Sequence, residues 1–320
     1  MTQQTSGLHR DLFLPECVDP DTLALNSNIE QKLSGEPPIY SLTAAEAREQ
    51  QARTSLRGQS AASGIASSRT VKGRRRDLRL RCFIPETISG VYLFLHGGGW
   101  VMGGADMQDE YLASIANSCG VAIASLDYRL APEHPYPAAP DDCEDAALWL
   151  ANTAHQEFNT STLLIGGESA GAHLAAVTLL RMRDRHAYTG FAAATMTSGV
   201  FDLTMTPSLA QSPDNKWPIN RDVMEWFVNH YGPEDLKDPD VSPLYADLRE
   251  MPPCLFVVGT FDPLLDDSLF MYTRWLAAGN HSKLGVYPGG THGFTALSSP
   301  VAVSARDSIH KFIRAHVGHM

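Results

Sequence analysis

The sequence lacks several features that would point to other classes of protein. Its 320 residues contain five cysteines, which are widely spaced and odd in number, so we expect reduced thiols and neither a disulfide framework nor a metal site. No apolar run approaches the roughly 18–20 residues that a membrane-spanning helix needs. The N-terminus has no basic start followed by an apolar stretch, as a secretory signal would. We therefore expect no membrane span and a cytoplasmic location.

Positive charge is also scarce. The formal net charge is −11, whereas a nucleic-acid partner needs a basic surface from which phosphate binding releases counterions. The exception is a local cluster of six basic residues between Lys72 and Arg81. An anion-binding or membrane-facing patch is one interpretation of this cluster, but we favour a solvated strand and turn. We expect no nucleic-acid partner.

Cofactor motifs are absent from the sequence. It contains no GxGxxG or P-loop pattern for a nucleotide, and no group of Cys, His, Asp and Glu with the spacing of a zinc site. We therefore expect neither a cofactor nor a metal ion.

The chain does contain a series of short apolar runs. Continuous apolarity of this kind predicts strands that are buried on both faces. Apolar residues at helical spacing lie between the runs, as from Cys143 to Leu150, so strands and helices are expected to alternate. The sequence predicts an α/β fold with a mostly parallel central sheet and helices on both faces. The runs lie at residues 91–95, 121–126, 162–165, 191–196, 254–258 and 284–287.

Two segments break this alternation. The first 60 residues are polar and interrupted by prolines, with a helix-favouring stretch from Leu42 to Arg57, and we expect them to lie outside the core. Residues 203–245 combine prolines with an aromatic stripe, which suggests an inserted lid. Such a stripe more often packs than contacts a ligand, but a lid over a pocket needs both. The candidate substrate contacts from it are Trp217, Trp226 and Phe227.

The candidate nucleophile is Ser169, in the run Gly167-Glu168-Ser169-Ala170-Gly171. This run directly follows an expected strand and opens a helix. A G-x-S-x-G run on such a strand–turn–helix presents the serine hydroxyl above a sheet, and the helix N-terminus points N–H groups at a developing oxyanion. Glycines frame the serine because the turn brings neighbouring backbones close together. This context predicts an α/β-hydrolase fold.

A serine nucleophile needs a histidine base, and the base needs a carboxylate to hold it. In this fold class the acid and then the histidine follow the serine, each at the end of a strand. Asp262 and His292 have these positions, although an Asp before Pro can simply initiate a turn, and Asp266 and Asp267 are rival carboxylates. Other histidines lie in polar or terminal contexts that are typical of the surface, among them His9, His155, His186, His230 and His310.

Consecutive glycines follow the first core strand, in the run from His96 to Trp100. Their backbone N–H groups are free to approach a substrate carbonyl, and each donor of an oxyanion hole is commonly worth about 3 kcal/mol. We predict a hole made by the amides of Gly98, Gly99 and Ala170. His96 is open to interpretation as a second base or a metal ligand, but we expect it to support the loop.

Taken together, these motifs resemble the hormone-sensitive-lipase-like esterases, the bacterial family IV branch of the α/β-hydrolases, over about residues 85–315. The resemblance implies a triad of Ser169, Asp262 and His292 and the same oxyanion hole. It also implies that residues 1–60 and 203–245 form a helical cap on a core of residues 61–202 and 246–320. The motifs are HGGGW at 96–100, DYRLAPEHPYPAA at 127–139, GESAG at 167–171, DPLLD at 262–266 and HGF from 292.

One residue departs from the family pattern, because Glu168 stands where Asp or Thr is commoner. A contact with the cap or substrate and a hydrogen-bonded structural role are both open for this side chain. In relatives the segment from Asp127 is mainly structural, so its charged residues are expected to act as scaffold. The departure leaves the triad intact and the identity of the substrate open.

The function predicted from these residues is that of a serine carboxylesterase. It would hydrolyse short- to medium-chain esters of small molecules through an acyl-enzyme intermediate. An amide or carbamate hydrolase with the same triad is an alternative. So is a non-catalytic ligand receptor, although receptors in the wider family have lost the catalytic histidine. Dimers through the sheet edge occur among similar proteins, which suggests a homodimer.

Overall fold

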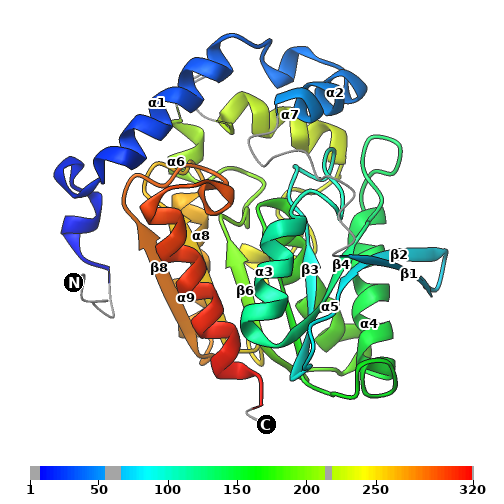
Figure 1. Ribbon diagram of the computed structural model, residues 1–320. Coiled ribbons are helices and arrows are strands. Elements are labelled where there is room, and N and C mark those ends of the chain that lie inside the picture. The colour runs from blue at the N-terminus through cyan, green and yellow to red at the C-terminus, as the bar shows by residue number, and fades with distance from the viewer. Residues whose placement is uncertain (1–7, 55–65, 213–217, 319–320) are drawn as a thin grey trace.

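The computed structural model describes residues 8–54, 66–212 and 218–318 (Figure 1). The strands in these residues are β1 (Ser67–Lys72), β2 (Asp77–Phe83), β3 (Gly90–Leu95), β4 (Val121–Leu126), β5 (Leu163–Glu168), β6 (Phe191–Thr197), β7 (Cys254–Gly259) and β8 (Ser282–Tyr287). They form one sheet in the order β1-β2-β4-β3-β5-β6-β7-β8. β2 pairs antiparallel with β1 and β4, and the other pairings are parallel. The predicted mostly parallel sheet is confirmed.

Burial explains why the central strands are continuous apolar runs. Every side chain of β3, β4, β5 and β7 is buried, as expected where helices cover both faces of a parallel sheet. β8 lies at the end of the strand order and is only half-buried. The six strands expected from the apolar runs correspond to β3 through β8.

Helices lie on both faces of the sheet, as predicted. α3 and α9 pack with Tyr92 and Phe94 on one face, whereas α4, α5 and α8 contribute to the larger cluster on the other face. The α-helices are α1 (Pro20–Ser34), α2 (Ala44–Thr54), α3 (Asp109–Cys119), α4 (Ala138–Phe158), α5 (Ala170–His186), α6 (Pro207–Ala210), α7 (Arg221–Tyr231), α8 (Leu265–Ala277) and α9 (Pro300–His316). The 3₁₀ helices are η1 (Arg10–Phe13), η2 (Pro15–Cys17), η3 (Ile39–Ser41), η4 (Pro243–Tyr245) and η5 (Phe294–Ala296).

Within the described part of the chain, none of these helices is long and apolar enough to cross a membrane.

The N-terminal segment packs more closely onto the core than its polar composition predicted. α1 begins directly at Pro20, because proline is well tolerated in the first turn and the Asp19 carboxylate accepts hydrogen bonds from the amides of Asp21 and Thr22. Farther along, Ala44 and Ala47 of α2 belong to the main hydrophobic cluster. Figure 1 shows α1, α2 and α7 at the same end of the sheet.

The basic cluster between Lys72 and Arg81 lies in β1, in β2 and in the turn between them, as the predicted strand and turn, and it is not a free anion patch. Each of its six side chains pairs with a carboxylate of a described residue. Three of these carboxylates, on Asp141, Asp142 and Asp145, belong to α4. The arginines of the β1–β2 hairpin therefore dock it on α4, a contact between distant segments that the sequence did not reveal.

Candidate active site

Ser169 occupies a sharp turn between β5 and α5. Its φ of 56° and ψ of −121° are unusual for a residue with a side chain, and such strain is typical of functional turns. A Cβ at Gly171 would overlap the carbonyl of Leu95, so only glycine fits there. The Ser169 amide donates to the Thr197 carbonyl at 2.9 Å, which anchors the backbone of the turn.

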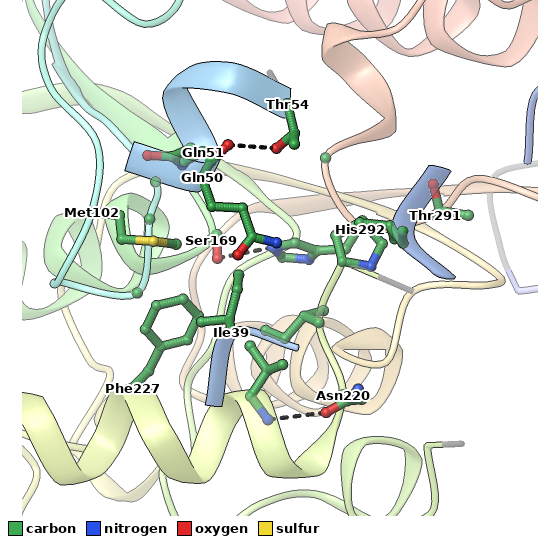
Figure 2. Close-up of a pocket in the computed structure, with 18 of the residues that line it drawn as sticks. Ile39, Gln50, Gln51, Thr54, Met102, Ser169, Asn220, Phe227, Thr291 and His292 are labelled. Atoms are coloured by element: carbon green, nitrogen blue, oxygen red, sulfur yellow. Dashed lines mark hydrogen bonds between the residues drawn. The ribbon is translucent and has the colours of Figure 1, made fainter. Parts of the chain in front are cut away.

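Three side chains predicted as a triad form one hydrogen-bonded chain. The Oγ of Ser169 lies 3.0 Å from Nε2 of His292 (Figure 2). Nδ1 of the same ring lies 3.1 and 3.2 Å from the two carboxylate oxygens of Asp262. Because a carboxylate only accepts, Nδ1 carries the hydrogen, and Nε2 is left to accept the Ser169 proton.

The Asp262 carboxyl is stabilised in its ionised form. Burial opposes ionisation, but the charge of His292 and its hydrogen bond outweigh this, with help from the Leu264 amide at 2.9 Å. The net result is a pKa below the ordinary value. Asp262 is therefore a carboxylate at neutral pH and can hold the imidazole in one tautomer.

The rival carboxylates have other partners. Asp266 accepts a hydrogen bond from the Ser208 amide at 2.8 Å. Asp267 accepts from the amides of Phe201 and Asp202 and from the Thr206 hydroxyl. Both carboxyl groups thus fasten the beginning of the inserted segment to α8. Burial raises the pKa of Asp267 to about 7.

The predicted oxyanion loop faces the same cavity. Gly98 and Gly99 both have positive φ values, of 120° and 59°, and both line the cavity beside Ser169. Among the described residues, no backbone carbonyl accepts a hydrogen bond from either glycine amide. The third predicted donor, Ala170, is the first residue of α5; it is fully buried and is not one of the residues that line the cavity.

His96 is placed as a support of this loop. Its ring stacks on Tyr128 with the ring centres 4.0 Å apart, and its Nδ1 lies 2.8 Å from the Gly97 carbonyl. The Tyr128 hydroxyl donates to the His96 carbonyl at 2.8 Å. Tyr128 comes from the segment that was expected to act as scaffold, and it holds the base of the glycine loop.

The cavity has a volume of about 270 Å³ and lies between the core and the two predicted cap segments. Figure 2 shows Ile39, Gln50, Asn220 and Phe227 around Ser169 and His292. Most of these wall residues come from positions that carry no local motif, and they meet only in the folded chain. The wall residues that sequence reasoning missed include Ile29, Leu33, Ile39, Gln50, Thr54, Met102, Met107, Ile219, Asn220 and Val223.

The three aromatic candidates from the inserted segment have different positions. Phe227 lines the cavity and packs against Gly99. Trp226 is not one of the wall residues: its indole N–H donates to the Leu42 carbonyl at 3.1 Å, so it joins α7 to the N-terminal segment. Trp217 lies outside the described residues.

Of the two roles that the sequence left open for Glu168, the structure shows the hydrogen-bonded one. Its side chain is buried and accepts a hydrogen bond from the Gln108 side-chain amide at 2.9 Å. It also lines the cavity beside the nucleophile. The residue that departs from the family pattern is therefore part of the pocket wall.

One expectation about histidine was wrong. His310 is buried, with 9% of its surface exposed, and burial lowers its pKa. It lies with Ala305, Ile309 and Ile313 on the buried face of α9. Its polar neighbours in the sequence suggested the surface, but helical spacing places it inward.

Known proteins with related sequences share the part of the chain that carries this site. Residues 92–296 match a family model described as alpha/beta hydrolase fold. The chain is 32% identical to the carboxylic ester hydrolase LipN of Mycobacterium tuberculosis over 71% of its own length. It is 33% identical to the carboxylesterase NlhH of the same organism over 72% of its length. The matches span 64% of LipN and 75% of NlhH.

A solved structure has the same architecture. A hyperthermophilic esterase from the archaeon Pyrobaculum calidifontis superposes with a TM-score of 0.85 at 28% sequence identity. The superposition covers 93% of this chain and 98% of that one. The two proteins therefore share the fold over most of the length of both chains.

Proposed function

Because this chain belongs to the alpha/beta hydrolase fold family, we propose that it is a serine carboxylesterase acting on short- to medium-chain esters of small molecules. The membership agrees with the predicted resemblance to the hormone-sensitive-lipase-like esterases. The observation that carries the proposal is the hydrogen-bonded chain from Ser169 through His292 to Asp262, which opens onto a cavity of about 270 Å³. The relatives named as ester hydrolases support the choice of bond.

Acylation begins at the serine hydroxyl. Nε2 of His292 takes the proton of Ser169, whose Oγ attacks the ester carbonyl carbon. The negative charge on the carbonyl oxygen is stabilised by the oxyanion-hole amides of Gly98, Gly99 and Ala170. When the intermediate collapses, the C–O bond to the alcohol breaks and His292 gives its proton to the departing oxygen. The acyl group remains on Ser169.

Deacylation repeats these steps with water. His292 takes a proton from a water molecule, whose oxygen attacks the acyl carbon, and the same amides stabilise the second intermediate. The bond to Ser169 Oγ then breaks, His292 returns the proton to Oγ, and the acid leaves. Asp262 remains ionised throughout and stabilises the positively charged imidazole, in keeping with its lowered pKa.

The cap is part of the proposal. Residues 1–60 and 203–245 would form it, and within them α1, α2 and α7 supply wall residues of the cavity. A substrate enclosed in this way contacts all three helices, so the cap determines which acyl and alcohol groups fit.

A location and an assembly are also proposed. All five cysteines are free thiols, four of them buried, which supports the cytoplasm. Among the described residues β8 has a neighbouring strand on one side only, which supports a homodimer through this edge. Light scattering after size-exclusion chromatography tests the dimer, and a monomer mass would contradict it.

The test of the activity compares the wild type with Ser169→Ala on p-nitrophenyl esters of increasing acyl length and on matched p-nitroanilides. We expect the wild type to hydrolyse the esters and Ser169→Ala to lose on the order of 10⁴-fold or more in kcat. Circular dichroism checks that the variant is folded. Full activity of folded Ser169→Ala would reject the mechanism, and faster hydrolysis of the anilides would reassign the enzyme to amides.

A further inference from the structure

Trp100 closes the glycine loop and is held by residues outside it. It is fully buried and has a positive φ of 61°, which a bulky residue adopts only where its surroundings enforce it. Its indole N–H donates to Nδ1 of His173 at 3.1 Å. Its carbonyl accepts a hydrogen bond from the Ala131 amide at 2.9 Å. The orientation of Gly98 and Gly99 therefore depends on how Trp100 is fixed.

His173 connects this loop with the far end of the inserted segment. It lies one turn after Ser169 on α5 and is fully buried. Its Nε2 lies 2.7 Å from the Val241 carbonyl. Because a carbonyl only accepts, Nε2 carries the hydrogen and Nδ1 is free to accept from Trp100. Burial lowers the pKa of His173 to about 4, so the ring stays neutral near pH 7 and keeps both bonds.

The inserted segment reaches the same loop at two further points. Tyr231 of α7 stacks on Trp100, with ring centres 4.5 Å apart and planes within 15°. Phe227 packs so closely on Gly99 that a Cβ there would overlap its ring. Phe227 and Tyr231 thus contact the loop that carries two oxyanion donors, and Val241 is joined to it through His173.

We propose that the inserted segment positions the oxyanion hole, and that His173 is the positioning residue that joins the two. The inference rests on the proposed function, because it assumes that Gly98 and Gly99 stabilise a developing oxyanion. His173 and Trp100 do not line the substrate cavity. Weakening their bond therefore misplaces the amides in the transition state while leaving substrate binding intact, so kcat falls and KM does not rise.

The test uses His173→Phe, Trp100→Phe and the double variant, all assayed on one p-nitrophenyl ester. Each phenylalanine keeps a buried ring and removes the hydrogen bond between the two residues. We expect each single variant to lose about tenfold in kcat with KM within about twofold of the wild type. The double variant should lose little more than the worse single variant, because both changes delete the same bond.

Two further variants separate positioning from general loss of structure. Trp275→Phe is the matched control. The buried indole of Trp275, on the distant helix α8, donates to the Pro252 carbonyl at 2.9 Å, and the substitution removes this hydrogen bond. It should lose stability like Trp100→Phe and keep kcat. His173→Asn offers an amide oxygen as an acceptor for the Trp100 indole and should recover part of the kcat that His173→Phe loses.

A boronic acid that mimics the tetrahedral intermediate gives the second readout. Its affinity should fall in parallel with kcat across the variants, by about tenfold for each phenylalanine substitution. If the phenylalanine variants do not fold, Tyr231→Leu replaces them, since it removes the stacking partner of Trp100 and should show the same loss.

The proposal would be overturned if the folded phenylalanine variants kept the wild-type kcat, or if their KM rose instead. It would also be overturned if the losses in kcat multiplied in the double variant, or if His173→Asn recovered none of the kcat that His173→Phe loses. Failure of the proposed function is distinguishable, because then the wild type itself would not hydrolyse the ester through Ser169.

Discussion

The reactivity of His292 depends on one carboxylate. Asp262 is 3% exposed and lies within 3.2 Å of Nδ1, so it fixes the tautomer that leaves Nε2 as an acceptor. An asparagine there can offer its N–H₂ group to Nδ1, which favours the wrong tautomer.

We therefore expect Asp262→Asn to lower kcat by about 10³- to 10⁴-fold with little change in stability. Steady-state kinetics on a p-nitrophenyl ester measure this loss. Asp266→Asn is the control, because its carboxylate binds the Ser208 amide and no part of the triad. Equal losses in the two variants would show that the carboxylate next to His292 has no special role.

Asp267 predicts a dependence of stability on pH. Its pKa in the folded protein is raised to about 7 by burial, whereas in an unfolded chain it is about 4. The folded state therefore holds the proton more tightly, and this contribution to stability is present below about pH 4 and lost as the pH rises through about 7. The free energy of unfolding of the wild type minus that of Asp267→Asn should fall over this range.

Urea unfolding of both proteins at several pH values between 4 and 8 gives this difference. A difference that stays constant or grows with pH would contradict the ionisation assigned to Asp267.

At the residue scale, the sequence predicts the three side chains that form the hydrogen-bonded chain, but only a few residues of the pocket wall, such as Phe227. Ser169, Asp262 and His292 are predictable because each follows an apolar run that ends at the same edge of a parallel sheet. Gln50 carries no such signal. It lines the cavity because α2 contacts the loop that follows β3, where the Arg48 side chain donates to the Val101 carbonyl at 2.8 Å, and no local pattern encodes such a long-range contact. His173 was missed for the same reason, since its partners are 73 and 68 residues away.

At the element scale, α7 presents two adjacent aromatic residues with different partners. Phe227 faces the cavity, whereas Trp226 donates to the Leu42 carbonyl. Phe227→Ala should enlarge the cavity and raise the ratio of kcat/KM for p-nitrophenyl octanoate to that for the butyrate by about tenfold. The ratio is the readout, because loss of the contact with Gly99 lowers kcat for both esters.

Trp226→Phe is the matched control for this helix. It should leave the octanoate to butyrate ratio unchanged and cost about 1 kcal/mol in the free energy of unfolding for the lost hydrogen bond. If Trp226→Phe changes the ratio as much as Phe227→Ala does, the separation of packing and pocket roles is wrong.

The elements themselves were predictable in unequal measure. β3 through β8 each contain a short apolar run, so they stand out in the sequence. α1 does not, because Pro20 resembles an interruption in the sequence until it is seen in the first turn of the helix. β1 and β2 lie around the basic stretch that was predicted as a strand and turn, but the carboxylate partners of their arginines were not predictable, because these partners lie far away in the sequence.

At the scale of the whole molecule, negative charge should influence the choice of substrate. The net charge is −11, and Glu36 and Glu168 line the cavity, whereas no lysine or arginine is found among its described wall residues. An anionic ester is therefore repelled both at long range and inside the pocket. We expect kcat/KM for monomethyl succinate to be about tenfold or more below that for methyl butyrate.

Added salt should reduce the long-range part of this difference, because charges are screened beyond about 10 Å at 0.1 M ionic strength. Glu168→Gln should narrow the difference in kcat/KM between the two esters that remains in added salt. The rates are measured by pH-stat titration of the released acid. Equal rates for the two esters in the wild type would contradict a pocket of this charge.

The proposed function requires that acyl transfer takes place at Ser169. A fluorophosphonate probe tests it most directly, because the probe reacts with a serine only where a base activates it and an oxyanion hole stabilises the adduct. We expect about one adduct per chain, located on the peptide that contains Ser169, with esterase activity lost in proportion to labelling and no labelling of Ser169→Ala. An unlabelled wild type, or an adduct on another residue in a chain that remains active, would contradict it.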